Sequence, residues 1–275
     1  MTGFRAESLT VSYGASRIID GCSFPLENGC VTGLLGANGS GKTTLLRAIC
    51  GILPHGGSCR LDGMALEGMS VRQLAKLCAY IPQRSGISID IPVIDVVLMG
   101  FHARLGLLGH PTASMRRAAS AAQASGGEGG MEEHNYLHLS EGQKQLCIFA
   151  RTLVTDCRML ILDEPESALD YRLRYRMLTL LRERIGQRRG CALVALHDPV
   201  LALNCCDRLL FLSGGRIAGA VSPMTDPPEE TERQLSLVYG PVQLSRCVSR
   251  TGTAQWVMLR DVPTDDRING EGDRP

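Results

Sequence analysis

Apolar and polar residues follow different periods in different parts of the chain. Between residues 4 and 26 they alternate, with a turn at Tyr13–Gly14, and this pattern predicts two antiparallel strands. Continuously apolar runs at 31–35, 159–162 and 192–196 have the composition of strands that are buried on both faces. These runs predict a parallel sheet.

The segment between about residues 85 and 142 has a different character. Its patterns are helical and are interrupted by Gly and Pro, and it contains no convincing long strand. The Gly/Ser-rich stretch 124–130 is expected to interrupt a helix. We interpret the segment as an inserted helical subdomain.

The sheet pattern resumes after this segment. A helix is predicted from about Leu169 to Ile185, and residues 209–220 have the pattern of a hairpin that turns at Gly214–Gly215. A pair of strands is predicted around Thr251–Gly252. The polar tail after Val262 is expected to be disordered.

Residues 36–44 read GANGSGKTT and fit the phosphate-binding loop pattern G-x-x-x-x-G-K-[ST]. Glycines let the backbone curl so that amide N–H groups converge on a β-phosphate, and the helix that starts near Lys42 adds its positive dipole end. Lys42 can reach the β- and γ-phosphate oxygens, and the Thr43 hydroxyl can ligate Mg²⁺. A glycine-rich turn that binds nothing is disfavoured by the apolar strand before the loop and the helical pattern after it. The predicted ATP-binding residues of the loop are Gly36, Ala37, Asn38, Gly39, Ser40, Gly41, Lys42, Thr43 and Thr44.

Three further predicted strand ends carry polar residues, and ligands of open parallel sheets bind at such ends. Asp163 is the expected partner of Mg²⁺, directly or through a water. Glu164 can take a proton from a water that attacks the γ-phosphate, and His197 can donate to the γ-phosphate oxygens. Gln83 can offer its amide to the metal or to the attacking water. The predicted catalytic residues are Lys42, Glu164 and His197, and the predicted metal ligands are Thr43, Gln83 and Asp163.

Each of these strand-end residues also has an ordinary structural interpretation when it is taken alone. Asp163–Glu164 can be a helix N-cap region, and His197 can be a hydrogen-bonded structural residue. Gln83 alone is uninformative. The phosphate loop upstream favours the functional interpretation, which is nucleotide hydrolysis.

Composition narrows the setting in which the protein works. The 275 residues are enough for one large domain or two small ones, and the formal net charge of +1 gives no field that favours nucleic acid or an anionic membrane surface. No apolar stretch approaches the length that spans a bilayer, and the N-terminus lacks the apolar core of a signal peptide. The eleven cysteines contain no C-x-x-C pair. We interpret them as small buried hydrophobic residues in a reducing cytosol, not as disulfides or metal ligands.

A second motif carries a resemblance to a known family. Residues 139–143 read LSEGQ and resemble the LSGGQ signature of the ATP-binding subunits of ABC transporters. The other motifs of that family follow in its order and spacing: Gln83 for the Q-loop, residues 160–164 for the Walker B strand, Ser167–Asp170 for the D-loop and His197 for the switch histidine. Tyr13 is similar to the aromatic residue that stacks on adenine. The resemblance extends to about residue 262.

The resemblance implies a fold of the α/β class: a P-loop NTPase (RecA-like) core with an antiparallel β-subdomain and an inserted α-helical subdomain. The expected units are 1–84 for the N-terminal part of the core with the β-subdomain, 85–152 for the helical signature subdomain, 153–225 for the rest of the core, 226–262 for a small C-terminal extension and 263–275 for a disordered tail.

The resemblance also implies how the nucleotide is held. Ser140 and the backbone of Gly142 lie at a predicted helix N-terminus, which is a ready anion site. In ABC ATPases this site caps the γ-phosphate held by the partner subunit's phosphate loop, so that two copies enclose two ATP molecules. A plain N-cap role for Ser140 is compatible with this. The ATP-binding residues implied outside the loop are Tyr13, Gln83, Ser140, Gly142, Gln143, Asp163 and Asp170.

The implied cofactors are ATP and Mg²⁺. The implied partners are a second copy of the chain, transmembrane permease subunits and, indirectly, a substrate-binding protein, with no nucleic acid. The implied location is the cytoplasmic side of the cell membrane, where the chain is peripheral. The segments 97–102 (VLMGFH) and 197–202 (HDPVLA) resemble those of importers of iron–siderophore complexes, haem and cobalamin. Since this subunit does not touch the transported substrate, the choice among these stays open.

Three residues depart from the family pattern. Glu141 replaces a signature glycine, Glu166 a threonine and Leu146 an arginine. We expect Glu141 to point away from the phosphate because repulsion there is costly. One alternative is a regulatory or slow-turnover ABC subunit. Another is a soluble ABC ATPase that acts on ribosomes or DNA, which the single cassette, the near-neutral charge and the lack of a heptad run disfavour.

Overall fold

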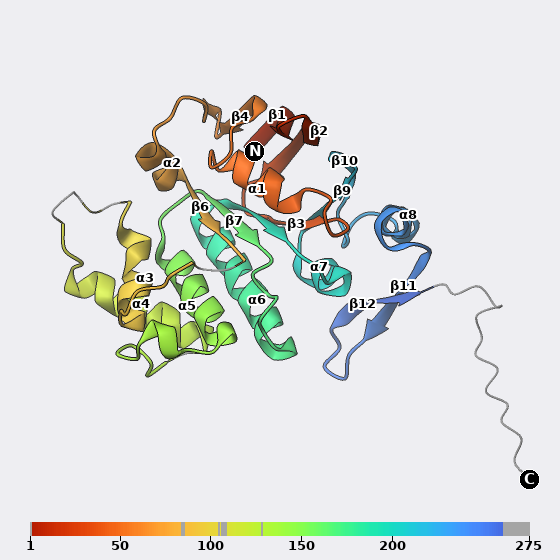
Figure 1. Cartoon of the computed structure of the whole chain (residues 1–275). Coiled ribbons are helices and arrows are strands. Elements are labelled where there is room, and N and C mark those ends of the chain that lie inside the picture. The colour runs from red at the N-terminus through yellow and green to blue at the C-terminus, as the bar shows by residue number, and fades with distance from the viewer. Residues whose placement is uncertain (1, 84–85, 104, 106–108, 128, 261–275) are drawn as a thin grey trace, which may run out of the picture.

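The computed structural model describes residues 2–83, 86–103, 105, 109–127 and 129–260 (Figure 1). Its strands are β1 (Thr2–Tyr13), β2 (Ser16–Glu27), β3 (Val31–Leu35), β4 (Gly56–Leu61), β5 (Met64–Ala65), β6 (Cys78–Ile81), β7 (Met159–Asp163), β8 (Cys191–Ala195), β9 (Arg208–Ser213), β10 (Arg216–Val221), β11 (Val242–Val248) and β12 (Ala254–Arg260).

The α-helices are α1 (Lys42–Ile49), α2 (Val71–Leu77), α3 (Val93–Leu98), α4 (Ala113–Gly126), α5 (Glu141–Val154), α6 (Tyr171–Arg188), α7 (Pro199–Cys205) and α8 (Pro228–Tyr239). Two short 3₁₀ turns, η1 (Met99–Phe101) and η2 (Tyr136–His138), complete the helical segment. None of the helices in the described ranges is both long and apolar enough to cross a membrane.

A six-stranded sheet in the order β10-β9-β3-β8-β7-β6 forms the centre of the molecule. The pairs β6–β7, β7–β8, β8–β3 and β3–β9 are parallel, and only the edge pair β9–β10 is antiparallel. The three continuously apolar runs of the sequence become β3, β7 and β8, which are adjacent. Their burial on both faces confirms the prediction of a covered parallel sheet.

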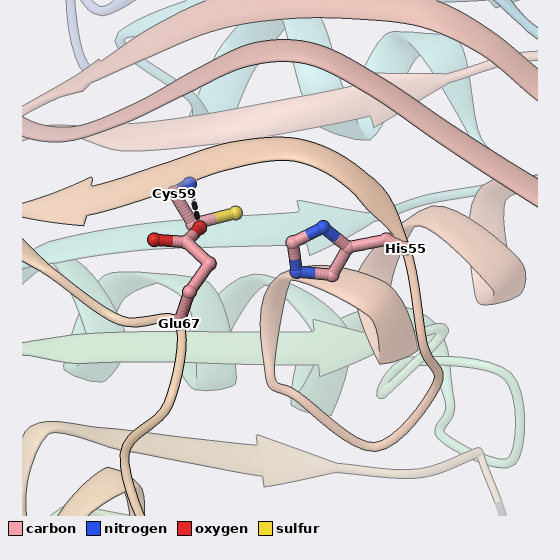
Figure 2. Close-up of side chains that lie close together, drawn as sticks. All are labelled: His55, Cys59 and Glu67. Atoms are coloured by element: carbon pink, nitrogen blue, oxygen red, sulfur yellow. Dashed lines mark hydrogen bonds between the residues drawn. The ribbon is translucent and has the colours of Figure 1, made fainter.

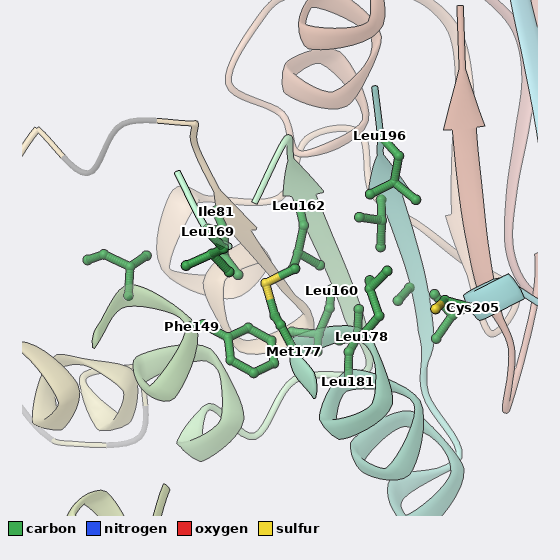
Figure 3. Packing of buried hydrophobic residues seen from close by; sticks show 14 of the residues in the cluster. Ile81, Phe149, Leu160, Leu162, Leu169, Met177, Leu178, Leu181, Leu196 and Cys205 are labelled. Carbon is green, nitrogen blue, oxygen red and sulfur yellow. The ribbon is translucent and has the colours of Figure 1, made fainter. Parts of the chain in front are cut away.

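Alternate residues of each central strand serve two different hydrophobic cores. On β7, Leu160 and Leu162 face the core shared with α3, α5 and α6, while Met159 and Ile161 face the core shared with α1 and the second sheet. Figure 3 shows Phe149 of α5 and Met177 of α6 beside the two leucines. The carboxyl ends of the strands are thereby fixed from both sides.

The second sheet has the order β2-β1-β4-β5 and is antiparallel. It lies over α1, on the opposite side of the central sheet from α5 and α6 (Figure 1). The long pair β1–β2 confirms the two antiparallel strands predicted from residues 4–26. Its hairpin end carries Tyr13, which is half exposed.

The helical segment lies at the β6 end of the central sheet (Figure 1). As predicted, the Gly/Ser stretch ends a helix: α4 stops at Gly126, and Gly127 has a φ of 104°. The predicted helix at 169–185 begins two residues later, because the Asp170 side chain accepts the Leu173 N–H at 2.9 Å and caps it.

The C-terminal part contains α8 and the hairpin β11–β12. The strand pair is confirmed, whereas α7 and α8 correspond to no predicted element. Both helices begin with a proline in the first turn, and α8 also has Glu229 and Glu230 there, which suits a helix N-terminus. The tail predicted as disordered, 263–275, lies outside the described residues.

All eleven cysteines lie in the described part of the chain, and none forms a disulfide. Nine are buried, Cys30 is half buried and Cys247 is exposed. The interpretation of most of them as small core residues therefore holds.

Candidate nucleotide site

The phosphate loop connects β3 to α1, as the pattern predicts. Gly39 and Gly41 have φ values of 77° and 101°, a conformation that side chains other than glycine rarely adopt. A Cβ atom on Gly36 would lie 2.6 Å from the Leu212 carbonyl oxygen. The three glycines are therefore needed for a tight loop whose amides lead into the N-terminus of α1.

Lys42 is the first residue of α1, and its side chain is 6% exposed. Its Nζ donates to the carbonyl oxygens of Gly36 at 2.8 Å and Ala37 at 3.3 Å, so the ammonium lies across the mouth of its own loop. Burial lowers its pKa, and the negative charges of Glu164 and Asp163 act in the opposite direction.

Thr43 and Asp163 place two oxygen atoms side by side that could ligate a magnesium ion. The Thr43 hydroxyl donates to Asp163 Oδ1 at 3.1 Å, and Asp163 is 2% exposed at the end of β7. Burial raises the pKa of Asp163, although its hydrogen bonds from Thr43 and Tyr80 oppose this. A hydroxyl and a carboxylate on one side of the loop fit Mg²⁺, a hard cation that binds through one or two carboxylates.

Glu164 lies between the two other strand-end residues. Its Oε2 accepts a hydrogen bond from Gln83 Nε2 at 2.7 Å and lies 2.6 Å from His197 Nε2. Its backbone has a φ of 51°, which is strained for a residue with a side chain, and its N–H donates to the Ala195 carbonyl at 3.1 Å. Such strain is typical of positions that orient a side chain for function.

Gln83 therefore contacts Glu164, and no contact to Thr43 or Asp163 is found among the described residues. Its amide reaches the carboxylate that faces the cavity, not the pair of oxygen donors. Its role as a metal ligand stays a prediction.

Glu166 is a second buried carboxylate beside His197. It is 2% exposed; its Oε1 accepts the His197 backbone N–H at 3.1 Å, and within the described ranges its Oε2 has no hydrogen-bond partner. Burial raises the pKa of Glu166, and the His197 N–H opposes this. Sequence reasoning identified Glu166 as a departure from the family pattern, but not this contact.

A cavity of about 480 Å³ lies beside these groups, and Lys42, Thr43, Glu164 and His197 reach it. It is lined by Tyr13, Ile18, Asn38, Gly39, Gly41, Lys42, Thr43, Thr44, Glu164 and His197. The chain thus brings the predicted adenine-stacking residue, most of the phosphate loop and all three predicted catalytic residues to one cavity. Its volume suits a nucleotide-sized ligand.

The signature residues lie elsewhere. Ser140 caps α5: its Oγ accepts the Gln143 N–H at 3.3 Å, and Gln143 Oε1 accepts the Ser140 N–H at 2.9 Å. Asp170 caps α6. Neither these three residues nor Gly142 lines the phosphate-loop cavity. A different cavity, of about 500 Å³, is lined by Gln83, Glu141, Gln145, Ser167 and Ala168.

Sequence reasoning missed Tyr80 and Arg47. The Tyr80 hydroxyl donates to Asp163 Oδ2 at 3.0 Å and accepts from Arg47 Nε at 3.4 Å. Burial raises the pKa of Tyr80 to about 12, so the phenol stays a donor to the carboxylate. The sequence shows only that Tyr80 lies on a short strand. That this strand pairs with β7 and brings Tyr80 close to Asp163 depends on the strand register, which the sequence does not give.

Known proteins resemble this chain in sequence and in fold. A family model described as "ABC transporter" matches residues 19–167, which is more than half of the chain. The hemin import ATP-binding protein HmuV of Bordetella pertussis is 36% identical over 247 residues, covering 86% of this chain and 91% of that protein. The chain belongs to the ABC transporter family. It is an ATP-binding subunit and an ATPase of that family.

Solved structures agree on the fold. A metal-chelate type ABC transporter in an inward-facing conformation has a TM-score of 0.76 at 22% identity, over 94% of this chain and 98% of that one. The dimeric structure of the bacterial ABC transporter cassette MJ0796 has a TM-score of 0.73 at 19% identity, over 80% of this chain and 98% of that one. The predicted P-loop NTPase core with its antiparallel and helical parts is confirmed.

Proposed function

We propose that Glu164 is the general base of ATP hydrolysis in this chain. The observation that carries the proposal is the position of its carboxylate, at the edge of the phosphate-loop cavity and between Gln83 Nε2 and His197 Nε2. Because both contacts use Oε2, we assign Oε1 to the attacking water. His197 then releases Glu164 and donates to the γ-phosphate oxygens.

Lys42, Thr43 and Asp163 hold the triphosphate in this proposal. Lys42 turns from its own loop carbonyls to the β- and γ-phosphate oxygens, and the amides of residues 36–44 surround the β-phosphate. Thr43 and Asp163 would hold Mg²⁺, with Gln83 as a further ligand; bound there, the ion neutralises charge on the phosphate oxygens. The adenine stacks on Tyr13, which is exposed at the cavity.

The Glu164→Gln variant tests the proposal. It keeps the side chain's size and one acceptor oxygen but removes the base, so hydrolysis falls by about 10²–10⁴-fold while ATP affinity is retained. Steady-state ATPase assays and equilibrium nucleotide binding measure the two quantities. Glu183→Gln, an exposed residue of α6, is the matched control. Turnover that survives in Glu164→Gln rejects Glu164 as the base.

We propose that the active form is a head-to-tail homodimer in which the partner completes each site. Ser140, Gly142, Gln143 and Asp170 lie outside the phosphate-loop cavity of their own chain, and Ser140 and Asp170 are exposed. The MJ0796 cassette, which has the same fold, was solved as a dimer. The Glu164→Gln variant should accumulate as a dimer in ATP, and size-exclusion chromatography with light scattering measures this.

We propose haem as the transported substrate, moved inward through a permease to which this chain binds on the cytoplasmic side of the membrane. The name of the relative at 36% identity supports this choice over siderophores and cobalamin. A substrate-binding protein would deliver haem from outside. The test reconstitutes the chain with its permease and binding protein in liposomes. Haem should stimulate ATP hydrolysis, whereas stimulation by cobalamin or a ferric siderophore alone would refute the proposal.

The division of the chain into units is part of the same proposal. We assign 1–84 and 153–225 to the nucleotide-binding core with its β-subdomain, 85–152 to the helical part and 226–262 to the C-terminal extension. The slow-turnover alternative is favoured by one feature, the carboxylate of Glu141 in the signature. It predicts that the low rate is insensitive to Glu164→Gln.

A further inference from the structure

Three side chains with metal-binding atoms converge away from the nucleotide site. They are His55 before β4, Cys59 on β4 and Glu67 after β5, and their ligand atoms all lie within 4.8 Å of one another. Figure 2 shows the imidazole edge, the thiol and the carboxylate turned toward the same space. It is the only such group of His, Cys, Asp and Glu found among the described residues.

We propose that His55, Cys59 and Glu67 form a binding site for a divalent transition-metal ion of the zinc class. Imidazole nitrogen, thiolate sulfur and carboxylate oxygen are the three donor types that zinc takes in proteins. Mg²⁺ and Ca²⁺ prefer oxygen donors and are poorly served by this set. Three protein ligands leave a further position for a water molecule.

Two of the three side chains are oriented by a second contact. His55 Nδ1 lies 3.3 Å from the Gly56 carbonyl oxygen, and a proton on Nδ1 donates there and leaves the Nε2 lone pair for a metal. Glu67 Oε1 accepts the Cys59 backbone N–H, which keeps the carboxylate beside the thiol. Bonds of this kind commonly fix metal ligands in position.

The surroundings give an ion both space and access. A cavity of about 430 Å³ is lined by all three residues. Cys59 is 1% exposed, His55 is half buried and Glu67 is exposed, so the site runs from solvent to the buried sulfur. Met69 also lines the cavity and adds a soft thioether nearby.

The thiol must lose its proton when a metal binds. Burial, with the negative charge of Glu67, raises the pKa of Cys59 to about 12, so without metal the thiol is protonated at neutral pH. Binding therefore releases a proton from Cys59, and affinity should fall as the pH is lowered. The Cys59→Ser variant should lose this proton release.

The test uses the full chain, stripped of metal and free of nucleotide, titrated with Co²⁺ as a spectroscopic substitute for zinc. A thiolate–cobalt charge-transfer band should appear with one equivalent and be displaced by Zn²⁺. It should be absent in Cys59→Ser and present in Cys22→Ser, which changes another cysteine of the same hydrophobic core. Co²⁺ at Thr43 and Asp163 gives no such band because no sulfur is present there.

Two further variants keep the proposal testable if Cys59→Ser does not fold. His55→Ala and Glu67→Gln change a half-buried and an exposed side chain, and each should weaken Zn²⁺ binding by at least about tenfold in a chelator competition assay. A band that persists in Cys59→Ser, unchanged affinity in both other variants, or no band in the unmodified chain overturns the proposal. None of these readouts depends on ATP hydrolysis.

Discussion

The phosphate-loop cavity and the N-terminus of α5 are held in place in opposite ways. Beside the cavity, Asp163 and Glu164 are 2% and 8% exposed, and each contacts two side chains from other elements. At α5, Ser140 is exposed, and its side chain and backbone N–H form a capping box with Gln143. The residues at the cavity are held in place by the core of the chain, whereas Ser140 is held by one turn of helix.

This difference explains why the cavity can bind a nucleotide by itself, whereas the N-terminus of α5 needs a partner surface. Buried carboxylates keep their geometry without a ligand, because the strands that carry them are packed on both faces. An exposed helix N-terminus has free amide groups and attracts an anion, but it can act only where another surface brings one. The N-terminus of α5 should therefore contribute to catalysis without contributing to ATP binding at the cavity.

After Glu164→Gln, the largest effect on turnover is expected from Ser140→Ala. Removing one donor at a developing anionic charge costs about 10²–10³-fold in kcat, and the proposed role of Ser140 is to contact the partner's γ-phosphate. ATP affinity of the isolated chain should change little, since Ser140 does not line its cavity. Stopped-flow or steady-state ATPase assays and nucleotide binding to the monomer measure the two effects.

The chain contains a matched control for the lost helix cap. Ser70 and Gln73 form the same capping box at the start of α2. Ser70→Ala therefore has the same cost in stability, about 0.5–2 kcal/mol, without touching the proposed anion site. Equal turnover in the two variants would contradict the assignment of Ser140 to the nucleotide.

Lys42→Ala tests the other side of the comparison. The charged hydrogen bonds that Lys42 offers to phosphate are worth about 1.5–3 kcal/mol, which predicts ATP binding weaker by roughly 10–100-fold. Isothermal titration with ATP measures this, and Lys76→Ala, an exposed lysine of α2, is the control. Unchanged affinity would mean that Lys42 stays on the carbonyl oxygens of its own loop.

A smaller effect is expected at Glu166, whose buried carboxylate accepts the backbone N–H of His197. Glu166→Ala removes the acceptor of the His197 N–H, worth about 1 kcal/mol, and should lower turnover roughly fivefold. Glu166→Gln keeps an acceptor and should restore the rate. If both variants hydrolyse ATP like the unmodified chain, the contact does not position His197.

The same residue makes a prediction about pH. Burial raises the pKa of Glu166 in the folded state, so the folded protein favours the protonated carboxyl. The contribution of Glu166 to the free energy of unfolding is therefore fully present below its unfolded pKa and is lost as the pH rises through its folded pKa. Glu166→Gln should therefore unfold at a higher temperature than the unmodified chain at neutral pH. The difference should shrink as the pH is lowered into the acid range, and thermal unfolding followed by circular dichroism measures it.

The features that could be predicted from the sequence were those with a strong local pattern. β3, β7 and β8 follow from continuous apolar runs, and the phosphate loop follows from its glycines and Lys42. α8 was not predicted, because its polar sequence shows its amphipathic face only against β10 and β11. The contacts of Tyr80 with Asp163 and of Glu166 with His197 depend on strand register and on a backbone N–H, which no spacing reveals.

The cysteine prediction shows the same limit in another form. Burial of nine cysteines agrees with their interpretation as core residues. At Cys59 the fold adds His55 and Glu67 from either side in the sequence, at spacings that fit no metal motif. Convergence of this kind arises from the hairpin β4–β5 and the loop before it, so only the structure makes it visible.

The smallest effect is expected from Glu141→Gly, which restores the usual signature glycine. The Glu141 carboxylate pairs with Lys144 Nζ at 2.9 Å, and its side chain is 75% exposed. An exposed ion pair contributes only about 0–1 kcal/mol, so the substitution should leave the melting temperature nearly unchanged.

If the Lys144 ammonium screens the carboxylate, as this pairing suggests, turnover should rise no more than about fivefold. Lys144→Ala should then slow turnover in the unmodified chain and have no effect in Glu141→Gly. A large increase in rate from Glu141→Gly alone would instead show that the carboxylate opposes the partner's phosphate, and that the exposed half of the site sets the rate.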